Sequence, residues 1–295
     1  MYWIFTGRLS VEHIEVAIAD LPTSLNGTKI VLMSDFHYDG LRLSEELLAQ
    51  AIAQSNQAEA DLIVLTGDYI TSDPTPIHQL ALRLKHLQSR LGVYAVLGNH
   101  DIYYRQSKSE VTKALSSVDI RVLWNEIAYP FGSQFPLVGL AEFWSREFNP
   151  IPVMQSLDRS IPRLVLSHNP TTAKILKQWR VDLQLSGHTH GGQVALPLVA
   201  PLMKLAKYQS VIRKKIPPQV REWLPYMKRD CNRLVRNWRW MQGLHQIGEN
   251  QLYVNRGLGT YAPGRIFCPP EVTIITLTQQ KNAEMGESLY PLANM

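Results

Sequence analysis

Residues 29–37 read KIVLMSDFH, a short apolar run followed at once by a carboxylate and an imidazole two positions apart. The run is rich in β-branched residues and leucine, which predicts a buried strand at Lys29–Met33. Asp35 and His37 then stand just beyond the carboxyl end of that strand. On an extended backbone, side chains at i and i+2 point the same way, so the two are expected to face one ligand.

The same arrangement recurs along the chain. Further strands are expected at Asp61–Leu65, Val93–Leu97, Arg163–Leu166, Val181–Leu185, Leu252–Asn255 and Glu271–Leu277. Helical patterns lie between them at Ser44–Asn56, with Ser44 as the N-cap, at Thr75–Ser89 and at Thr171–Trp179. This alternation predicts an α/β fold in which sheets are buried between helices.

Side chains able to bind metals follow five of these strands. They form the blocks Asp35-Phe36-His37, Gly67-Asp68, Gly98-Asn99-His100-Asp101, Ser167-His168 and Gly187-His188-Thr189-His190. Loops at the carboxyl ends of strands converge on one sheet edge, where α/β proteins hold ligands. Carboxylate, imidazole and carboxamide donors without thiolate suit Mn, Fe or Zn.

The five blocks in this order resemble the calcineurin-like metallophosphoesterases. The similarity extends to Ile14-Glu15-Val16, to Gly191-Gly192-Gln193 and to residues 255–260 (NRGLGT). The similarity is greatest to a bacterial subgroup of this family. That subgroup includes membrane-associated phosphohydrolases, and UDP-2,3-diacylglucosamine diphosphatases of lipid A synthesis resemble it. The resemblance implies a four-layer αββα sandwich, formed here by a single domain over residues 1–295.

The resemblance also implies two divalent metal ions, Mn²⁺ first, with Fe or Zn as alternatives. The first ion would be held by Asp35, His37 and His190, and the second by Asn99, His168 and His188, with Asp68 bridging the two. Two cations roughly 3.5–4 Å apart need a shared anionic ligand, and a hydroxide bridging them becomes a nucleophile at neutral pH.

Two further roles are expected near this centre. His100 is the expected proton donor to the leaving group, with Asp101 orienting its ring or raising its pKa. Arg256 and Arg265 are expected either to contact substrate phosphate or to be solvated surface charges.

Composition is that of an ordinary globular protein. The 295 residues are 45% hydrophobic and 19% charged, which excludes disorder, collagen and coiled coil. No apolar run approaches the ~20 residues of a membrane-spanning helix. Cys231 and Cys268 cannot form a disulfide framework, so a cytoplasmic location is expected.

Positive charge is concentrated in one stretch. The net charge is +5, yet eleven Lys or Arg and only two acidic residues lie between Pro201 and His245. Two amphipathic patterns separated by Pro217-Pro218 predict a basic helical insertion at 198–245. The residues expected to contact an anionic membrane are Trp238, Arg229, Arg233, Arg236 and Arg239. The alternatives are helices packed on the sandwich with a solvated basic face and, less favoured, nucleic-acid binding.

These features predict a dimetal-dependent phosphohydrolase that cleaves a phosphoester or pyrophosphate bond. The expected substrate is lipid-linked, such as UDP-2,3-diacylglucosamine, at the inner face of the cell membrane. The alternatives are a soluble phosphodiesterase or phosphatase of small substrates, and a metal-binding scaffold without turnover. Loss of a ligand or of His100 would favour the scaffold, and the sequence retains them all.

Overall fold

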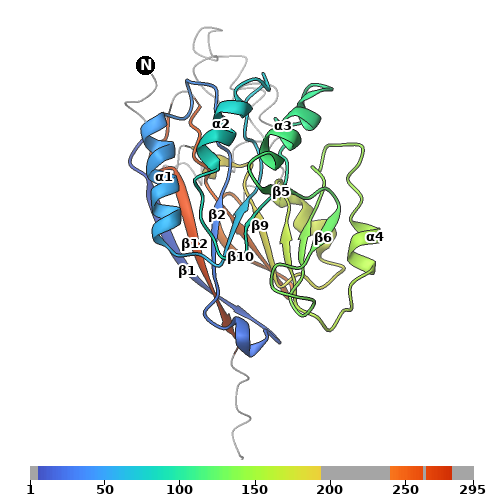
Figure 1. Cartoon of the computed structure of the whole chain (residues 1–295). Helices are drawn as coiled ribbons and strands as arrows, with labels where there is room; N and C mark the ends of the chain where they lie inside the picture. The colour runs from blue at the N-terminus through green and yellow to red at the C-terminus, as the bar shows by residue number, and fades with distance from the viewer. Residues whose placement is uncertain (1–5, 194–239, 262–263, 281–295) are drawn as a thin grey trace, which may run out of the picture.

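Within the part of the chain that the structure describes, two six-stranded sheets form the centre (Figure 1). The computed structural model describes residues 6–193, 240–261 and 264–280. In the first sheet the strand order is β1-β12-β2-β3-β4-β5. The bounds are β1 Ser10–Ile18, β12 Glu271–Gln279, β2 Lys29–Met33, β3 Leu62–Leu65, β4 Val93–Ala95 and β5 Ile120–Val122. Strands β2 to β5 are parallel, so their carboxyl ends share one edge.

The second sheet has the order β10-β11-β9-β8-β7-β6. Its strands are β10 Gly243–Ile247, β11 Asn250–Val254, β9 Leu183–Ser186, β8 Leu164–Leu166, β7 Leu137–Gly139 and β6 Glu126–Ala128. Strands β11, β9, β8 and β7 are parallel, which again places their carboxyl ends at one edge.

Helices cover the outer face of each sheet (Figure 1). Ile30 and Leu32 point inward and join a cluster with Leu183 and Leu185 of the second sheet, while Val31 and Met33 pack with the helices outside the first sheet. These helices are α1 Glu45–Gln57, α2 Ile77–Leu84 and α3 Ser107–Ser116; α4 Pro150–Gln155 and α5 Ala173–Leu176 flank the second sheet. The four-layer αββα sandwich is therefore confirmed, and coverage of both faces explains the continuous apolar runs.

Several predicted elements agree with the structure, and others were not predicted. Ser44 caps α1 by accepting the backbone N–H of Leu47 through its side chain. The helix expected at Thr75–Ser89 is shorter, and Thr171–Trp179 contains a 3-10 turn followed by α5. The three-residue strands β5, β6 and β7 were not predicted, and neither were the longer elements β1 and α3.

Most of the expected basic insertion, residues 198–239, lies outside the described residues, together with Trp238, Arg229, Arg233, Arg236 and Arg239. Its last residues are described, and there the prediction is wrong: strand β10 begins at Gly243, so a helix does not continue to 245. Among the described residues, no helix combines the length and the apolar character that crossing a membrane requires.

Candidate metal centre

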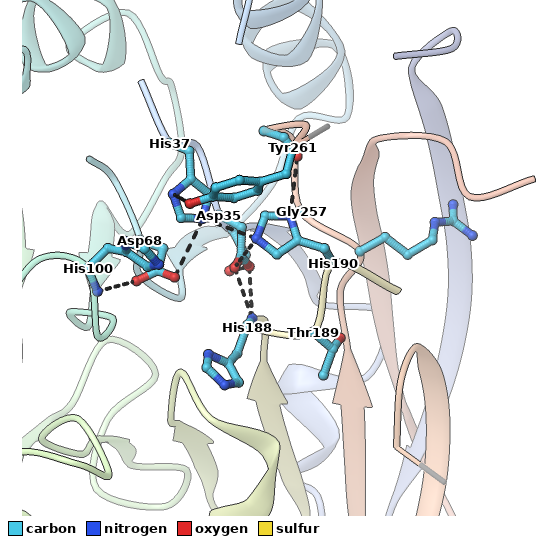
Figure 2. Close-up of polar contacts among 12 residues, drawn as sticks. Asp35, His37, Asp68, His100, His188, Thr189, His190, Gly257 and Tyr261 are labelled. Atoms are coloured by element: carbon cyan, nitrogen blue, oxygen red, sulfur yellow. Dashed lines mark hydrogen bonds and ion pairs between the residues drawn. The ribbon is translucent and has the colours of Figure 1, made fainter. Parts of the chain in front are cut away.

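Every residue that the sequence assigns to the metal centre lies in a loop at the carboxyl end of a parallel strand. The first sheet contributes Asp35 and His37 after β2, Asp68 after β3 and Asn99 after β4, and the second contributes His168 after β8 and His188 and His190 after β9. Figure 2 shows the loops of both sheets meeting, with contacts converging on the Asp35 carboxylate.

Asp35, His37 and His190 form a first group, whose ligand atoms all lie within 4.8 Å of one another. His190 Nε2 is 3.3 Å from Asp35 Oδ1 and 3.1 Å from His37 Nε2. Two imidazole nitrogens and a carboxylate oxygen thus surround one point, as cation coordination requires.

Asp68, His168 and His188 form a second group with the same 4.8 Å limit. His168 Nε2 lies 3.1 Å from Asp68 Oδ2, 3.2 Å from Asn99 Oδ1 and 3.2 Å from His188 Nδ1. Asp68 Oδ2 is also 3.6 Å from His37 Nε2 in the first group. The Asp68 carboxylate therefore lies between the two groups, where a shared ligand is needed.

Hydrogen bonds behind the rings fix which nitrogen faces each group. His168 Nδ1 lies 2.7 Å from the Thr66 carbonyl, and His190 Nδ1 lies 3.3 Å from the Gly259 carbonyl. A carbonyl can only accept, so Nδ1 carries the proton and the Nε2 lone pair is available for a metal. The donor set and its tautomers therefore fit divalent cations.

Protonation differs between the two groups of ligands. Burial lowers the pKa of His37 well below its usual range and that of His190 to about 4, so both are neutral at pH 7. Burial would also lower the pKa of His168, but the adjacent Asp68 carboxylate outweighs it and raises the value to about 10. A cation binding the second group must therefore displace a proton from His168.

Comparison with known proteins identifies the family. Residues 28–192 match the family model described as calcineurin-like phosphoesterase, which is more than half of the chain. The chain belongs to the calcineurin-like phosphoesterase family. Phosphodiesterase YaeI of Escherichia coli (strain K12) is 32% identical and matches 84% of this chain and 82% of its own length. Uncharacterized metallophosphoesterase YkuE of Bacillus subtilis (strain 168) is 30% identical, over 87% of this chain and 81% of that protein.

A third relative carries a more specific name. UDP-2,3-diacylglucosamine pyrophosphatase LpxG of Chlamydia muridarum is 26% identical, over 92% of this chain and 92% of that protein. The calcineurin-like phosphoesterase described here is accordingly a hydrolase of phosphorylated substrates, of a family that uses centres of two metal ions.

The backbone of the phosphoesterase centre is turned rather than extended. Asp35, His37, Asp68, His188 and His190 all have positive φ, between 44° and 72°. The expectation that i and i+2 side chains align on an extended backbone is therefore wrong. Left-handed turns bring the side chains together, and Asp and His are among the residues that tolerate this conformation best.

His100 lies beside both groups. One of its ring nitrogens falls within 4.8 Å of ligand atoms of His37 and Asp68, and its backbone N–H donates to Asp68 Oδ1 at 2.9 Å. Its Nδ1 pairs with the Thr71 carbonyl. Because a carbonyl only accepts, that contact holds a proton on Nδ1.

Asp101 has a different role from the one expected. Its carboxylate accepts the backbone N–H groups of Asp68, Tyr69 and Gly98, each at 2.8 Å. The prediction that it orients the His100 ring is corrected, because the Thr71 carbonyl occupies Nδ1 instead. Asp101 ties the loops after β3 and β4 to one another.

One of the two alternatives expected for Arg256 and Arg265, a solvated surface charge, is wrong. Arg256 pairs with Glu12 at 2.5 Å and Glu271 at 2.9 Å. Arg265 is buried and donates to the backbone carbonyls of Arg256, Gly257 and Gly259. Their guanidinium groups are paired inside the protein, so neither is a solvated charge, and contact with substrate phosphate stays a prediction.

Two residues near the phosphoesterase centre were missed in the sequence. The Tyr261 hydroxyl lies 3.0 Å from His37 Nδ1, and its ring packs edge-on against His190 (Figure 2). Glu142, after β7, is 1% exposed, and burial raises the pKa of its carboxyl to about 7. Glu142 could have been found in the sequence because it follows a strand. Tyr261 has a weaker signal, since it is marked only by its position directly after the NRGLGT block.

The raised pKa of Glu142 predicts a pH-dependent stability of the metal-free protein. In the folded protein the Glu142 carboxyl stays protonated at pH values above its ordinary pKa of 4.5. Its contribution to the free energy of unfolding is therefore complete below pH 4.5 and is lost as the pH rises through about 7. The free energy of unfolding should fall by up to about 3 kcal/mol across that window. Glu142→Gln, which can still accept the N–H groups of Trp144 and Ser145, should make the slope shallower by that amount in urea titrations from pH 4 to 8, while buried Asp101, whose pKa is also raised to about 7, keeps its own share. An unchanged slope would contradict the assignment.

Proposed function

We propose that this phosphoesterase hydrolyses the pyrophosphate bond of a nucleotide-linked lipid such as UDP-2,3-diacylglucosamine, at the inner face of the cell membrane. The hydrolytic part is carried by Asp68, whose Oδ2 is shared between His168 at 3.1 Å and His37 at 3.6 Å. The lipid part is supported by similarity, over 92% of both chains, to a protein named UDP-2,3-diacylglucosamine pyrophosphatase.

The proposed ligands are those expected from the sequence. Asp35, His37 and His190 would hold one ion, Asn99, His168 and His188 the other, and Asp68 would bridge them, with Mn²⁺ as the proposed metal. When bound, two such ions supply a nucleophilic hydroxide at neutral pH and stabilise charge on the phosphoryl oxygens. Asp68 and Asp35 would hold the cations in place, and the buried histidines would keep water from their inner side.

His100 is proposed to donate a proton to the departing oxygen. The Thr71 carbonyl pairs with Nδ1 of its ring, and one ring nitrogen lies within 4.8 Å of ligand atoms of His37 and Asp68, so the imidazolium form would donate from Nε2. His100→Asn should lower kcat about 100-fold for an alkyl phosphodiester, because an alkoxide leaves only when it is protonated. The loss should be several-fold smaller for bis(p-nitrophenyl) phosphate, whose leaving group departs as an anion.

Steady-state kinetics on both substrates would measure this difference. His78→Ala is a matched control, since that histidine lies on α2 with 62% of its side chain exposed. Equal losses on the two substrates would show that His100 has no part in proton transfer.

The substrate proposal is tested by mass spectrometry of the Mn²⁺-loaded protein with UDP-2,3-diacylglucosamine. Release of UMP and the lipid monophosphate would support it. Cleavage of bis(p-nitrophenyl) phosphate alone would favour the second candidate, a phosphodiesterase of small soluble substrates, which similarity to a named phosphodiesterase supports. No turnover of either substrate would favour a metal-binding scaffold.

Membrane contact is proposed on sequence grounds alone. The basic stretch between Pro201 and His245 would bind an anionic leaflet through Trp238, Arg229, Arg233, Arg236 and Arg239. Neutralising these arginines should abolish sedimentation with phosphatidylglycerol vesicles while leaving hydrolysis of the soluble ester unchanged.

A further inference from the structure

An exposed tryptophan stands directly against one of the candidate metal ligands. Trp144, in the loop after β7, packs its ring against that of His188 with the ring centroids 5.0 Å apart and the planes at 72°. Trp144 nevertheless keeps 44% of its surface exposed. A large apolar ring left open at the margin of a catalytic centre is available to contact whatever binds there.

The loop holds this ring in a fixed position. The buried Glu142 carboxylate accepts the backbone N–H of Trp144 at 2.5 Å and that of Ser145 at 3.1 Å through the same oxygen. Behind the loop, Phe143 packs edge-on against Phe148 with the ring centroids 5.4 Å apart. These contacts hold the turn that carries Trp144 in one conformation. Because the turn is already ordered, less conformational entropy is lost when a ligand binds.

From this geometry we infer that Trp144 is a stacking platform for the nucleobase of the substrate. It lies beside the second group of metal ligands, which would bind the substrate's phosphate. The inference rests on the proposed function and names the part of the substrate that Trp144 binds. An indole face stacks on any base. Ser145 and the exposed Arg146 follow Trp144, and such polar neighbours suit a base and ribose better than an acyl chain.

Calorimetric titration of the Mn²⁺-loaded full chain tests the platform without requiring turnover. The probes are UMP and methyl phosphate, which share a phosphate monoester and differ in the nucleoside. Trp144→Ala should raise the Kd of UMP about tenfold, within the range for aromatic–base stacking, and leave the Kd of methyl phosphate unchanged. Trp144→Phe should keep most of the UMP affinity, because it restores an aromatic face.

Tyr129→Ala is the matched control. Tyr129 is 53% exposed and precedes β7, so it lies at the opposite end of that strand from Trp144, and its loss should change neither Kd. Equal weakening of UMP and methyl phosphate in Trp144→Ala, or no weakening of either, would overturn the platform. So would selective weakening of decyl phosphate, which would identify an acyl chain as the occupant.

Failure of the proposed function has a different signature. If UDP-2,3-diacylglucosamine is not cleaved while Trp144→Ala still weakens UMP selectively, the lipid substrate is wrong and the nucleobase platform stands. If the lipid is cleaved while UMP binding is insensitive to Trp144, the platform is wrong and the lipid substrate stands.

Discussion

Replacing Asp68 with asparagine should lower kcat/KM by about 1,000-fold for every phosphoester that the protein cleaves. The substitution keeps the shape of the side chain and removes the one negative charge shared by the two groups of ligands. Without it, two cations would repel each other with no bridging anion between them. Bound metal, measured by mass spectrometry of the desalted protein, should fall from two ions to one or none.

The same substitution should change His168. Asp68 raises the pKa of that ring against the effect of burial, so in Asp68→Asn the ring should be neutral at pH 7 in the metal-free protein. Histidine NMR titration would show this directly. Asp158→Asn, at an exposed carboxylate, is the control and should leave activity and metal content unchanged. Two bound ions and normal turnover in Asp68→Asn would refute the bridging role.

Replacing Arg265 with methionine should destabilise the protein by about 3–5 kcal/mol, because several buried carbonyls would lose their donor together. Its guanidinium donates to the carbonyls of Arg256, Gly257 and Gly259 at 2.9, 3.0 and 2.6 Å. Methionine fills the volume but provides no N–H group. The urea midpoint measures the loss, and Arg105→Met, at an exposed arginine, is the control.

Arg265→Met should also weaken metal binding at the first group. Arg265 holds the loop that contains Gly259, and this loop contacts two ligands of the first group. The Gly259 N–H donates to the Asp35 carbonyl at 2.7 Å, and the Gly259 carbonyl lies 3.3 Å from His190 Nδ1. A side chain at Gly257 would lie 2.5 Å from Asp35 Cβ, which shows how closely this loop approaches the ligand. If Arg265→Met destabilises the protein by less than about 1 kcal/mol, water has replaced the hydrogen bonds of the guanidinium and the predicted structural role is wrong.

Local pattern in the sequence determined the framework of this protein. The apolar run at Lys29–Met33 became β2 with the same bounds, and Ser44 became the cap of α1. Each potential ligand sits just past a parallel strand, and parallel strands end at one edge, so order along the chain was enough to predict that the ligands meet. The blocks and their order also indicated the family.

Only the tertiary structure decided how the ligands meet and which residues support them. Asp35 and His190 converge through left-handed turns that no side-chain alternation predicts. Arg265 looked in the sequence like a charge for solvent or phosphate, and Asp101 like a partner for His100, yet both satisfy buried backbone groups. The physical reason is that a buried polar group takes the partners that the packed loops present, and those partners lie far away along the chain.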